Sequence, residues 1–244
     1  MKRIALVTGA NKGLGFETAR QLGEKGIKVL MASRNKERGQ HAVEKLKAEG
    51  LDVELVQLEA TNDADIEALK QYIESAYGKL DILVNNAGIM HNDEPLGVNT
   101  SESISAETLQ HTFDVNFFSV VRLTQALLPL LKKSEAGRII NLSSILGSNT
   151  VQSDTSSPYY GVKPFAYNAS KAALNSFTVH LAASLEGTSI KVNSAHPGWV
   201  KTDLGTEGAP MEVVDGAKTS VSLSLSEETD FSGKFIHMGE EVAW

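Results

Sequence analysis

Short runs of apolar residues alternate along the chain with segments whose apolar residues recur every three or four positions. Seven such runs, rich in Val, Ile and Leu, predict buried strands over 3–8, 27–33, 52–58, 81–88, 137–144, 189–196 and 233–238. The periodic segments predict helices over about 14–25, 36–50, 62–76, 105–133, 167–186 and 210–225. Pro129 predicts a bend in the longest helix.

This alternation predicts the fold class. Strands that are apolar on both faces belong in a parallel sheet covered by helices on each side. We therefore expect an α/β fold with a doubly wound, mostly parallel seven-stranded sheet. The chain has no internal repeat, linker or break in composition, which favours one domain over 1–244. Residues 145–166 are rich in Ser, Pro, Gly and Tyr and predict a loop.

Composition excludes several classes of function. The net charge of −7 and the lack of a long basic run disfavour nucleic-acid binding. The chain has no cysteine, which rules out disulfides and thiolate zinc sites and fits a reducing cytoplasm. No apolar stretch is long enough to cross a membrane, and the one at the N-terminus is too short for a signal peptide. The six histidines show no metal-binding spacing, so we expect no catalytic metal.

A glycine-rich turn, "TGANKGLG", joins the first predicted strand to the first predicted helix. An isolated glycine turn is weak evidence, but the strand before it and the helix after it favour nucleotide binding. Glycines there let a pyrophosphate approach, and the helix N-terminus supplies N–H groups and the positive end of the dipole. The cofactor-binding residues expected in this turn are Gly9, Asn11, Lys12, Gly13, Leu14 and Gly15.

The residues at the next two strand ends predict which dinucleotide binds. The second strand ends in Ser33 and Arg34, without the acid that usually holds an unphosphorylated ribose. Together with Lys12 they favour a ribose 2′-phosphate, and hence NADP(H), over the alternative that both cations are solvated surface charges. Glu59 and Ala60 after the third strand either abut the adenine or form an acidic loop before a helix.

A tyrosine and a lysine four positions apart occur twice, at Tyr159 with Lys163 and at Tyr167 with Lys171. Lys163 precedes Pro164, which disfavours helical backbone at that lysine. The second pair begins a segment with helical periodicity, which places both side chains on one face. Local physics therefore favours Tyr167 and Lys171 as the functional pair.

Five motifs then occur in a family-specific order: "TGANKGLG", "NNAG" (85–88), "NLSS" (141–144), "YNASK" (167–171) and "HPGWVKTD" (196–203). In this the chain resembles the short-chain dehydrogenases/reductases, which have a Rossmann fold. The stretch "SRNKERGQHAVEKLKAEG" resembles the NADPH-dependent carbonyl reductases among them. One departure is that Ser144 and Tyr167 are 23 positions apart. That spacing is longer than is usual in the family, and by spacing alone Tyr159 would be the better match to the family's catalytic tyrosine. We interpret 147–165 as an insertion beside the substrate.

The resemblance implies a set of catalytic roles. Tyr167 would be the general acid, and Lys171 would lower its pKa from the ordinary value of about 10 and bind the nicotinamide ribose. Ser144 would hydrogen-bond the substrate oxygen. Asn116 would kink the long helix and hold a water in a proton relay. These roles describe reduction of a ketone or aldehyde by NADPH, or oxidation of the matching alcohol.

Two further motifs complete the expected cofactor site. The motif "NNAG" contributes Asn86, Ala87 and Gly88. The motif "HPGWVKTD" contributes Pro197, Gly198, Val200 and Thr202. His196 is expected to be a strand-end residue rather than an acid–base group. The cofactor half would be about 1–135, and the catalytic and substrate-binding half about 136–244.

An apolar pocket built from 90–98, 145–165 and 199–211 is expected to hold the substrate. Its candidate residues are Ile145, Leu146, Tyr160, Phe165, Trp199 and Met211. Tyr160 or Tyr159 either touches the substrate or is a partly buried aromatic of the loop. The sequence leaves the carbonyl compound open, as it does the choice among monomer, homodimer and homotetramer. Two alternatives remain: another enzyme on this scaffold, acting on β-ketoacyl or sugar and polyol substrates, and a non-catalytic NADP sensor.

Overall fold

The alternation of strands and helices is retained throughout the computed structural model, which describes residues 2–225 and 231–244. The strands are β1 (Ile4–Thr8), β2 (Lys28–Ser33), β3 (Val53–Gln57), β4 (Ile82–Asn85), β5 (Arg138–Leu142), β6 (Lys191–Ala195), β7 (Phe235–His237) and β8 (Glu240–Glu241). The longer helices are α1 (Gly13–Glu24), α2 (Lys36–Ala48), α3 (Asp63–Tyr77), α4 (Ala106–Phe113), α5 (Ser119–Leu131), α7 (Phe165–Ser184) and α9 (Lys218–Leu225).

One sheet runs through the molecule in the order β3-β2-β1-β4-β5-β6-β7-β8. All neighbours pair in parallel except β7 and β8. Among the described residues the sheet thus has eight strands rather than the seven expected. The extra strand is a pair of exposed glutamates that returns after Gly239, at φ 90°, so it has no apolar pattern to reveal it.

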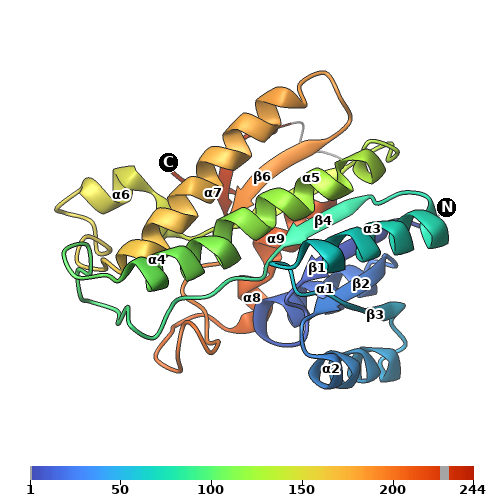
Figure 1. The fold of residues 1–244 in the computed structure, drawn as a ribbon, viewed down its shortest axis with the longest axis horizontal. Helices are drawn as coiled ribbons and strands as arrows, with labels where there is room; N and C mark the ends of the chain where they lie inside the picture. The colour runs from blue at the N-terminus through green and yellow to red at the C-terminus, as the bar shows by residue number, and fades with distance from the viewer. Residues whose placement is uncertain (1, 226–230) are drawn as a thin grey trace.

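Helices cover both faces of the sheet (Figure 1). One core cluster joins the sheet to α3, α5 and α7 through residues such as Ile73, Leu127 and Leu181. The other joins it to α1, α2 and α9 through residues such as Leu22, Leu46 and Val221. The fold is therefore a single Rossmann-like α/β domain, as predicted.

The longest predicted helix contains an irregular turn. Between α4 and α5 lies η1 (Asp114–Phe118), a single π-helical turn, and the helical path then continues past Pro129 to Leu131. Such turns mark functional positions in many proteins. Figure 1 shows this helix beside α7, with which α4 and η1 are in contact.

The predicted loop over 145–166 contains two short helical turns. They are η2 (Ile145–Gly147), directly after Ser144, and α6 (Asn149–Ser153). The predicted helix over 210–225 is divided into α8 (Val213–Gly216) and α9. Across the described residues, no helix combines the length and the apolar composition needed to cross a membrane.

The parallel register brings the carboxyl ends of five strands to one edge of the sheet. Thr8 is level with Ala32, Asn85 with Asn141, and Leu142 with Ala195. In open α/β sheets ligands bind outside this edge. The candidate site lies there.

Candidate active site

The glycine-rich turn has the backbone that an anion site needs. Gly9 and Gly13 have φ of 65° and 55°, a conformation that favours glycine. A Cβ on Gly15 would lie 2.4 Å from the Gly9 carbonyl oxygen, so no side chain fits. No side chain caps α1, whose first turn also lacks acidic residues. Its N–H groups and dipole therefore suit a pyrophosphate.

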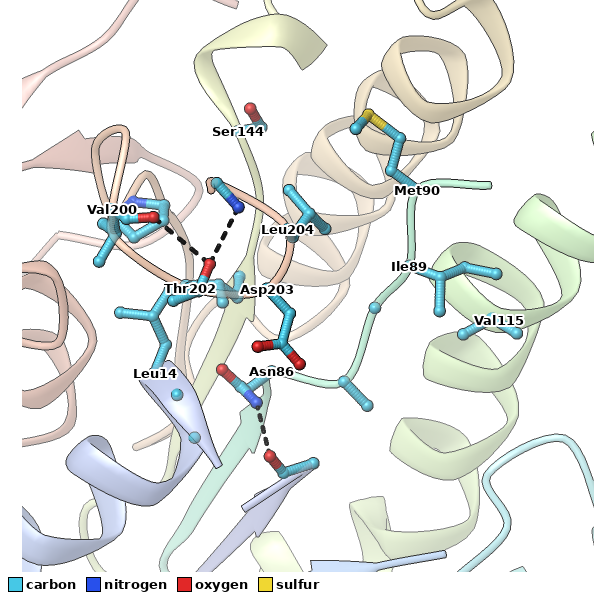
Figure 2. A pocket seen from close by; sticks show the side chains of 18 of the residues that line it. Leu14, Asn86, Ile89, Met90, Val115, Ser144, Val200, Thr202, Asp203 and Leu204 are labelled. Atoms are coloured by element: carbon cyan, nitrogen blue, oxygen red, sulfur yellow. Dashed lines mark hydrogen bonds between the residues drawn. The ribbon is translucent and has the colours of Figure 1, made fainter. Parts of the chain in front are cut away.

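A cleft of about 1140 Å³ extends from this turn across the carboxyl edge of the sheet. All nineteen residues predicted to bind the cofactor line it, as does Ser144. In Figure 2 one side of the cleft is apolar, with Ile89, Met90 and Val115, and faces the loop that carries Thr202 and Asp203. The predicted set is thus brought together in space.

Three cations surround one end of the cleft. Lys12 forms an ion pair with Asp203, and the Arg34 guanidinium lies 3.5 Å from a Glu59 carboxylate oxygen. The third is Arg38, which lines the cleft one turn after Arg34 and was not predicted from the sequence. The Arg34 side chain is 80% exposed, so an incoming phosphate can reach it. A cofactor with a 2′-phosphate fits this charge.

Ser33 has a different local role. Its side chain is buried, and its hydroxyl donates to the Asn35 carbonyl at 2.9 Å. Asn35 in turn caps α2 by accepting from the Arg38 N–H. Ser33 thus shapes the turn that presents Arg34 and Arg38.

Asn86 holds two strands together beneath the cleft. Its Nδ2 donates to the Thr8 carbonyl at 2.7 Å, and its backbone N–H donates to the Thr8 hydroxyl at 2.9 Å. The Ala87 N–H donates to the same hydroxyl. These bonds fix the backbone of residues 86–88 alongside the glycine-rich turn.

Thr202 stands across from that turn. A Cβ built on Gly13 would lie 3.5 Å from the Thr202 methyl carbon. The hydroxyl of Thr202 donates to the Val200 carbonyl and accepts from the Gly205 N–H, as Figure 2 shows. The hydroxyl is therefore already hydrogen-bonded within its own loop, and a ligand at this place would also contact the methyl group.

The predicted Tyr–Lys pair lies on α7, and its rival does not lie on a helix. Tyr167 and Lys171 both fall in the first two turns, whereas Tyr159 and Lys163 lie in the non-helical segment before α7. The Tyr167 side chain lies near enough to Ser144 for the serine hydroxyl to lower the tyrosine pKa. All three members of the Ser144–Tyr167–Lys171 group are buried. A proton donor and a hydroxyl thus meet where β5 ends.

Burial dominates the pKa values of both α7 residues. It raises the pKa of Tyr167 to about 12, and the nearby Ser144 hydroxyl offsets only part of that rise. It lowers the pKa of Lys171 to about 8. The Lys171 Nζ lies 5.7 Å from the centroid of the Tyr167 ring and donates to the Leu142 carbonyl at 2.8 Å. The expected lowering of the tyrosine pKa by Lys171 is therefore not found, because the ammonium is directed at a strand end.

Asn116 is fully buried in the π-helical turn and does not itself line the cleft. Its side chain accepts from the Ile89 N–H and donates to the Ile89 carbonyl, both at 2.8 Å, and also donates to the Ser170 hydroxyl at 3.0 Å. Asn116 thus ties the irregular turn to the segment after β4 and to α7. A Cβ on Gly88 would come within 3.3 Å of its Oδ1, so the glycine makes room for it.

Three of the six predicted substrate residues lie elsewhere. Ile145, Leu146 and Trp199 line the cleft. Tyr160 is 43% exposed and packs under the Lys163 ammonium, and Phe165 lines a separate cavity of about 190 Å³. Met211 pairs with Val200 and packs beside Gly198. An apolar loop residue can pack against other residues of its own loop, and sequence alone does not distinguish that packing from contact with a substrate.

Other side chains take the places of those three. Of the two neighbouring tyrosines, Tyr159 lines the cleft and Tyr160 does not. Pro158 and Val162 also line it, from the segment 145–165 that was expected to build the pocket, and the residues here that lie outside the predicted segments include Ile89, His111 and Val115. Val115 and His111 come from the long helix. Its periodicity could have shown which face packs on the sheet, but not which residues extend beyond the sheet into the cleft.

His196 organises the backbone of two loops. Its Nδ1 lies 3.3 Å from the Ile145 nitrogen and 3.4 Å from the Gly198 nitrogen, and accepts a hydrogen bond from each. Burial, with a smaller contribution from His237, lowers the pKa of His196 to about 3. A neutral imidazole that accepts two N–H groups suits a strand-end structural role, as predicted.

A family model described as short chain dehydrogenase matches residues 3–212. The chain belongs to this family. Short-chain dehydrogenases are oxidoreductases that use a nicotinamide cofactor and act on the alcohol–carbonyl couple, and this is the activity class of the protein.

Individual members of the family resemble the chain over nearly its full length. A (+)-neomenthol dehydrogenase of Arabidopsis thaliana is 34% identical, covering 91% of each chain. The carbonyl reductase (NADPH) 3 of Rattus norvegicus is also 34% identical over 91% of each. The solved structure of an NADPH-bound carbonyl reductase from chicken fatty liver has a TM-score of 0.86 and 29% identity, covering 100% of this chain and 99% of that one.

Proposed function

We propose that the protein is an NADPH-dependent carbonyl reductase whose general acid is Tyr167. The single observation that carries the proposal is the meeting of buried Ser144, Tyr167 and Lys171 in a cleft whose other end holds three cations. The printed names of the relatives support a ketone or aldehyde as substrate. The cofactor would bind mainly to residues 1–135, and the substrate mainly to 136–244.

The cations support NADPH over NADH. Arg34 and Arg38 lie at the end of β2 and the start of α2, where the adenosine ribose of a dinucleotide binds in this kind of fold. Lys12, which now pairs with Asp203, would turn to the phosphate. A guanidinium can bind a phosphate with two N–H groups at once, which makes Arg34 the strongest single determinant.

In the proposed reduction the hydride would come from NADPH when it is bound, and the protein would supply the proton. Ser144 would orient the carbonyl oxygen by a hydrogen bond from its hydroxyl. The Tyr167 hydroxyl would then give its proton to that oxygen as the oxygen gains charge. An alkoxide is a far stronger base than a phenolate, so a phenol of pKa about 12 still donates to it. The nearby Lys171 ammonium would stabilise the resulting tyrosinate.

Two alternative functions have less support. A reductase of carrier-bound β-ketoacyl groups would dock an acidic carrier, which a net charge of −7 does not favour. A non-catalytic NADP sensor would have no need for Ser144 and Tyr167 to meet at the base of the cleft. Sugar and polyol substrates fit poorly beside Ile89, Val115 and Leu146.

The proposal is tested with a panel of ketones and aldehydes with apolar bodies, assayed separately with NADPH and NADH. We expect consumption of NADPH with several of them and a much lower kcat/KM with NADH. Oxidation of the matching alcohols with NADP+ should be measured as the reverse reaction. Binding of NADPH without turnover of any compound in the panel would instead favour the sensor.

The role of Tyr167 is tested by its replacement with phenylalanine. Tyr167→Phe should lower kcat by about 10²- to 10⁴-fold, because general acid catalysis contributes that much. The Kd for NADPH, measured by fluorescence titration, should stay near the wild-type value. Tyr159→Phe is the matched control and should retain most of kcat. A reversal of these two results would move the proton donor to Tyr159.

A further inference from the structure

The helix that carries Tyr167 begins without a cap of its own. The residue before α7 is Pro164, which has no side chain that could accept from the first N–H groups. Those groups, on Phe165, Ala166 and Tyr167, have no partner within an α-helix. Left unbonded in a buried place, each would cost about 1–3 kcal/mol. Their partners come from another part of the chain.

A buried carboxylate far away in the sequence binds this helix end. Glu94 Oε1 accepts from the Ala166 N–H at 2.7 Å, and Oε2 accepts from the Tyr167 N–H at 3.0 Å. The Thr100 hydroxyl accepts from the Phe165 N–H and donates to Glu94 Oε1, both at 2.9 Å. Glu94 is only 1% exposed, so water cannot take the place of its carboxylate.

The same segment also forms part of the cleft. Residues 89–100 contribute Met90 and Leu96 to its lining, and Ile89 is held by Asn116. Glu94 lies between these contacts and bonds directly to the backbone of Tyr167. It therefore connects the apolar wall of the cleft to the turn of α7 from which the phenol projects.

We propose that Glu94 is a positioning residue, whose carboxylate fixes the first turn of α7 and thereby the place of the Tyr167 phenol beside Ser144. This rests on the proposed function of Tyr167 as the proton donor. Glu94 touches neither substrate nor cofactor in this account. It acts through the helix backbone.

Donor and acceptor chemistry explains why only a carboxylate suffices. The three groups that face Glu94 are all donors: one hydroxyl and two backbone N–H groups. A carboxylate has two acceptor oxygens and no proton, whereas a glutamine has one oxygen and an NH₂ group. Glu94→Gln keeps the volume but leaves at least one donor facing another donor. The loss falls on the turn that contains Tyr167.

The chain offers a matched control at the opposite edge of the sheet. Asp81 is also buried, 2% exposed, and accepts from the Ile4 N–H, the Lys79 ammonium and the Ser134 hydroxyl. Asp81→Asn makes the same chemical change to a carboxylate with donors around it. It lies at the start of β4, and the active site lies beyond its end.

The experiment compares wild type, Glu94→Gln and Asp81→Asn with NADPH and one accepted ketone. We expect Glu94→Gln to lower kcat by about 10- to 100-fold, since a displacement of about 1 Å can cost that much. The Kd for NADPH should change less than about twofold, as no cofactor contact is altered. Asp81→Asn should lower the melting temperature but leave kcat close to wild type.

A second measurement needs no turnover. Protein labelled with ¹³Cζ-tyrosine gives one signal for each of the five tyrosines, and Tyr167→Phe identifies that of Tyr167. Glu94→Gln should shift or broaden this signal, and Asp81→Asn should not. A wild-type protein that reduces no carbonyl, while Glu94→Gln still moves the signal, would refute the proposed function and support the positioning role.

Two results would overturn the inference. One is a folded Glu94→Gln protein with wild-type kcat and an unmoved Tyr167 signal. The other is an equal loss of kcat in Asp81→Asn, which would assign the effect to general destabilisation. Should Glu94→Gln not fold, Thr100→Val replaces it. That variant removes one hydrogen bond to α7 and should lower kcat about fivefold with an unchanged Kd for NADPH, whereas a wild-type kcat would refute the proposal.

Discussion

Tyr167 and Lys171 occupy a place in which neither side chain is easily charged. Burial alone makes the phenolate costly and the ammonium costly, which is why the pKa of Tyr167 rises to about 12 and that of Lys171 falls to about 8. Near neutral pH, Tyr167 therefore keeps its proton and Lys171 keeps its charge. A donor that holds its proton until a stronger base forms beside it is well suited to protonating an alkoxide.

Arg34 gives the prediction that belongs to a single side chain. Arg34→Asp should lower kcat/KM for NADPH by about 10- to 100-fold, because a charge-assisted hydrogen bond contributes about 1.5–3 kcal/mol and the new carboxylate repels the phosphate. The value for NADH should change little. Steady-state kinetics with both cofactors measure the ratio, and Lys45→Asp, on the exposed face of α2 outside the cleft, controls for net charge. An unchanged ratio would refute the role of Arg34.

At the scale of elements, the distance between Ser144 and Tyr167 depends on how η2 packs against α7. These two elements are in contact, and Gly147 packs against the backbone of α7. A Cβ on Gly147 would lie 2.7 Å from the backbone carbon of Lys171. The missing side chain allows the strand end that carries the serine to meet the helix that carries the tyrosine.

Gly147→Ala should therefore separate these elements. We expect a loss of about 1–3 kcal/mol in the free energy of unfolding, which is typical of overpacking, together with a lower kcat. Urea denaturation measures the first quantity and ketone reduction the second. Gly161→Ala is the control, since a Cβ there meets nothing within 4 Å. Equal free energies of unfolding for the two variants would show that the structure accommodates the added methyl group at residue 147 without losing stability.

Local patterns explain what the sequence could predict. The glycine-rich turn and the Tyr167–Lys171 spacing are each contained within one turn or one helix, so strand and helix periodicity places them correctly. Contacts between distant segments leave no such pattern. Glu94 comes close to Tyr167 only in the folded chain. Arg38 faces the cleft because of its position in the first turn of α2. Tyr159 and its neighbour Tyr160 differ only in the direction in which their side chains point. The pKa of Tyr167 likewise depends on burial, which residue spacing does not reveal.

At the scale of the whole molecule, the sheet separates function from much of the stability. The carboxyl edge carries the cleft, and the opposite edge contains Asp81 with its three donors. Burial alone would raise the pKa of Asp81, but the hydrogen bonds from Lys79, Ser134 and Ile4 lower it below its ordinary value. Its stabilising contribution is therefore present near neutrality and is lost as the pH falls through the lowered pKa.

His196 gives the whole-molecule prediction. Its pKa is about 3 in the folded protein and 6.5 when exposed, so the unfolded chain binds more protons between these values. The free energy of unfolding should fall as the pH is lowered from about 6.5 towards 3. His196→Asn keeps an acceptor for the Ile145 and Gly198 N–H groups but does not titrate, so its acid loss should be shallower. Denaturation across this range measures the slopes.

The matched control for that slope is His180→Asn, because His180 is an exposed imidazole on α7. Its curve should run parallel to that of wild type, with the contribution of Asp81 common to all three proteins. A His196→Asn curve parallel to wild type would show that another group accounts for the acid sensitivity.

The connection between α6 and α7 contributes Pro158, Tyr159 and Val162 to the cleft but no residue to the sheet or to either core cluster. Its amino acids can consequently be exchanged without moving Ser144, Tyr167 or Lys171. Substitutions confined to this connection could therefore change which substrate the cleft accepts while these three side chains keep their places.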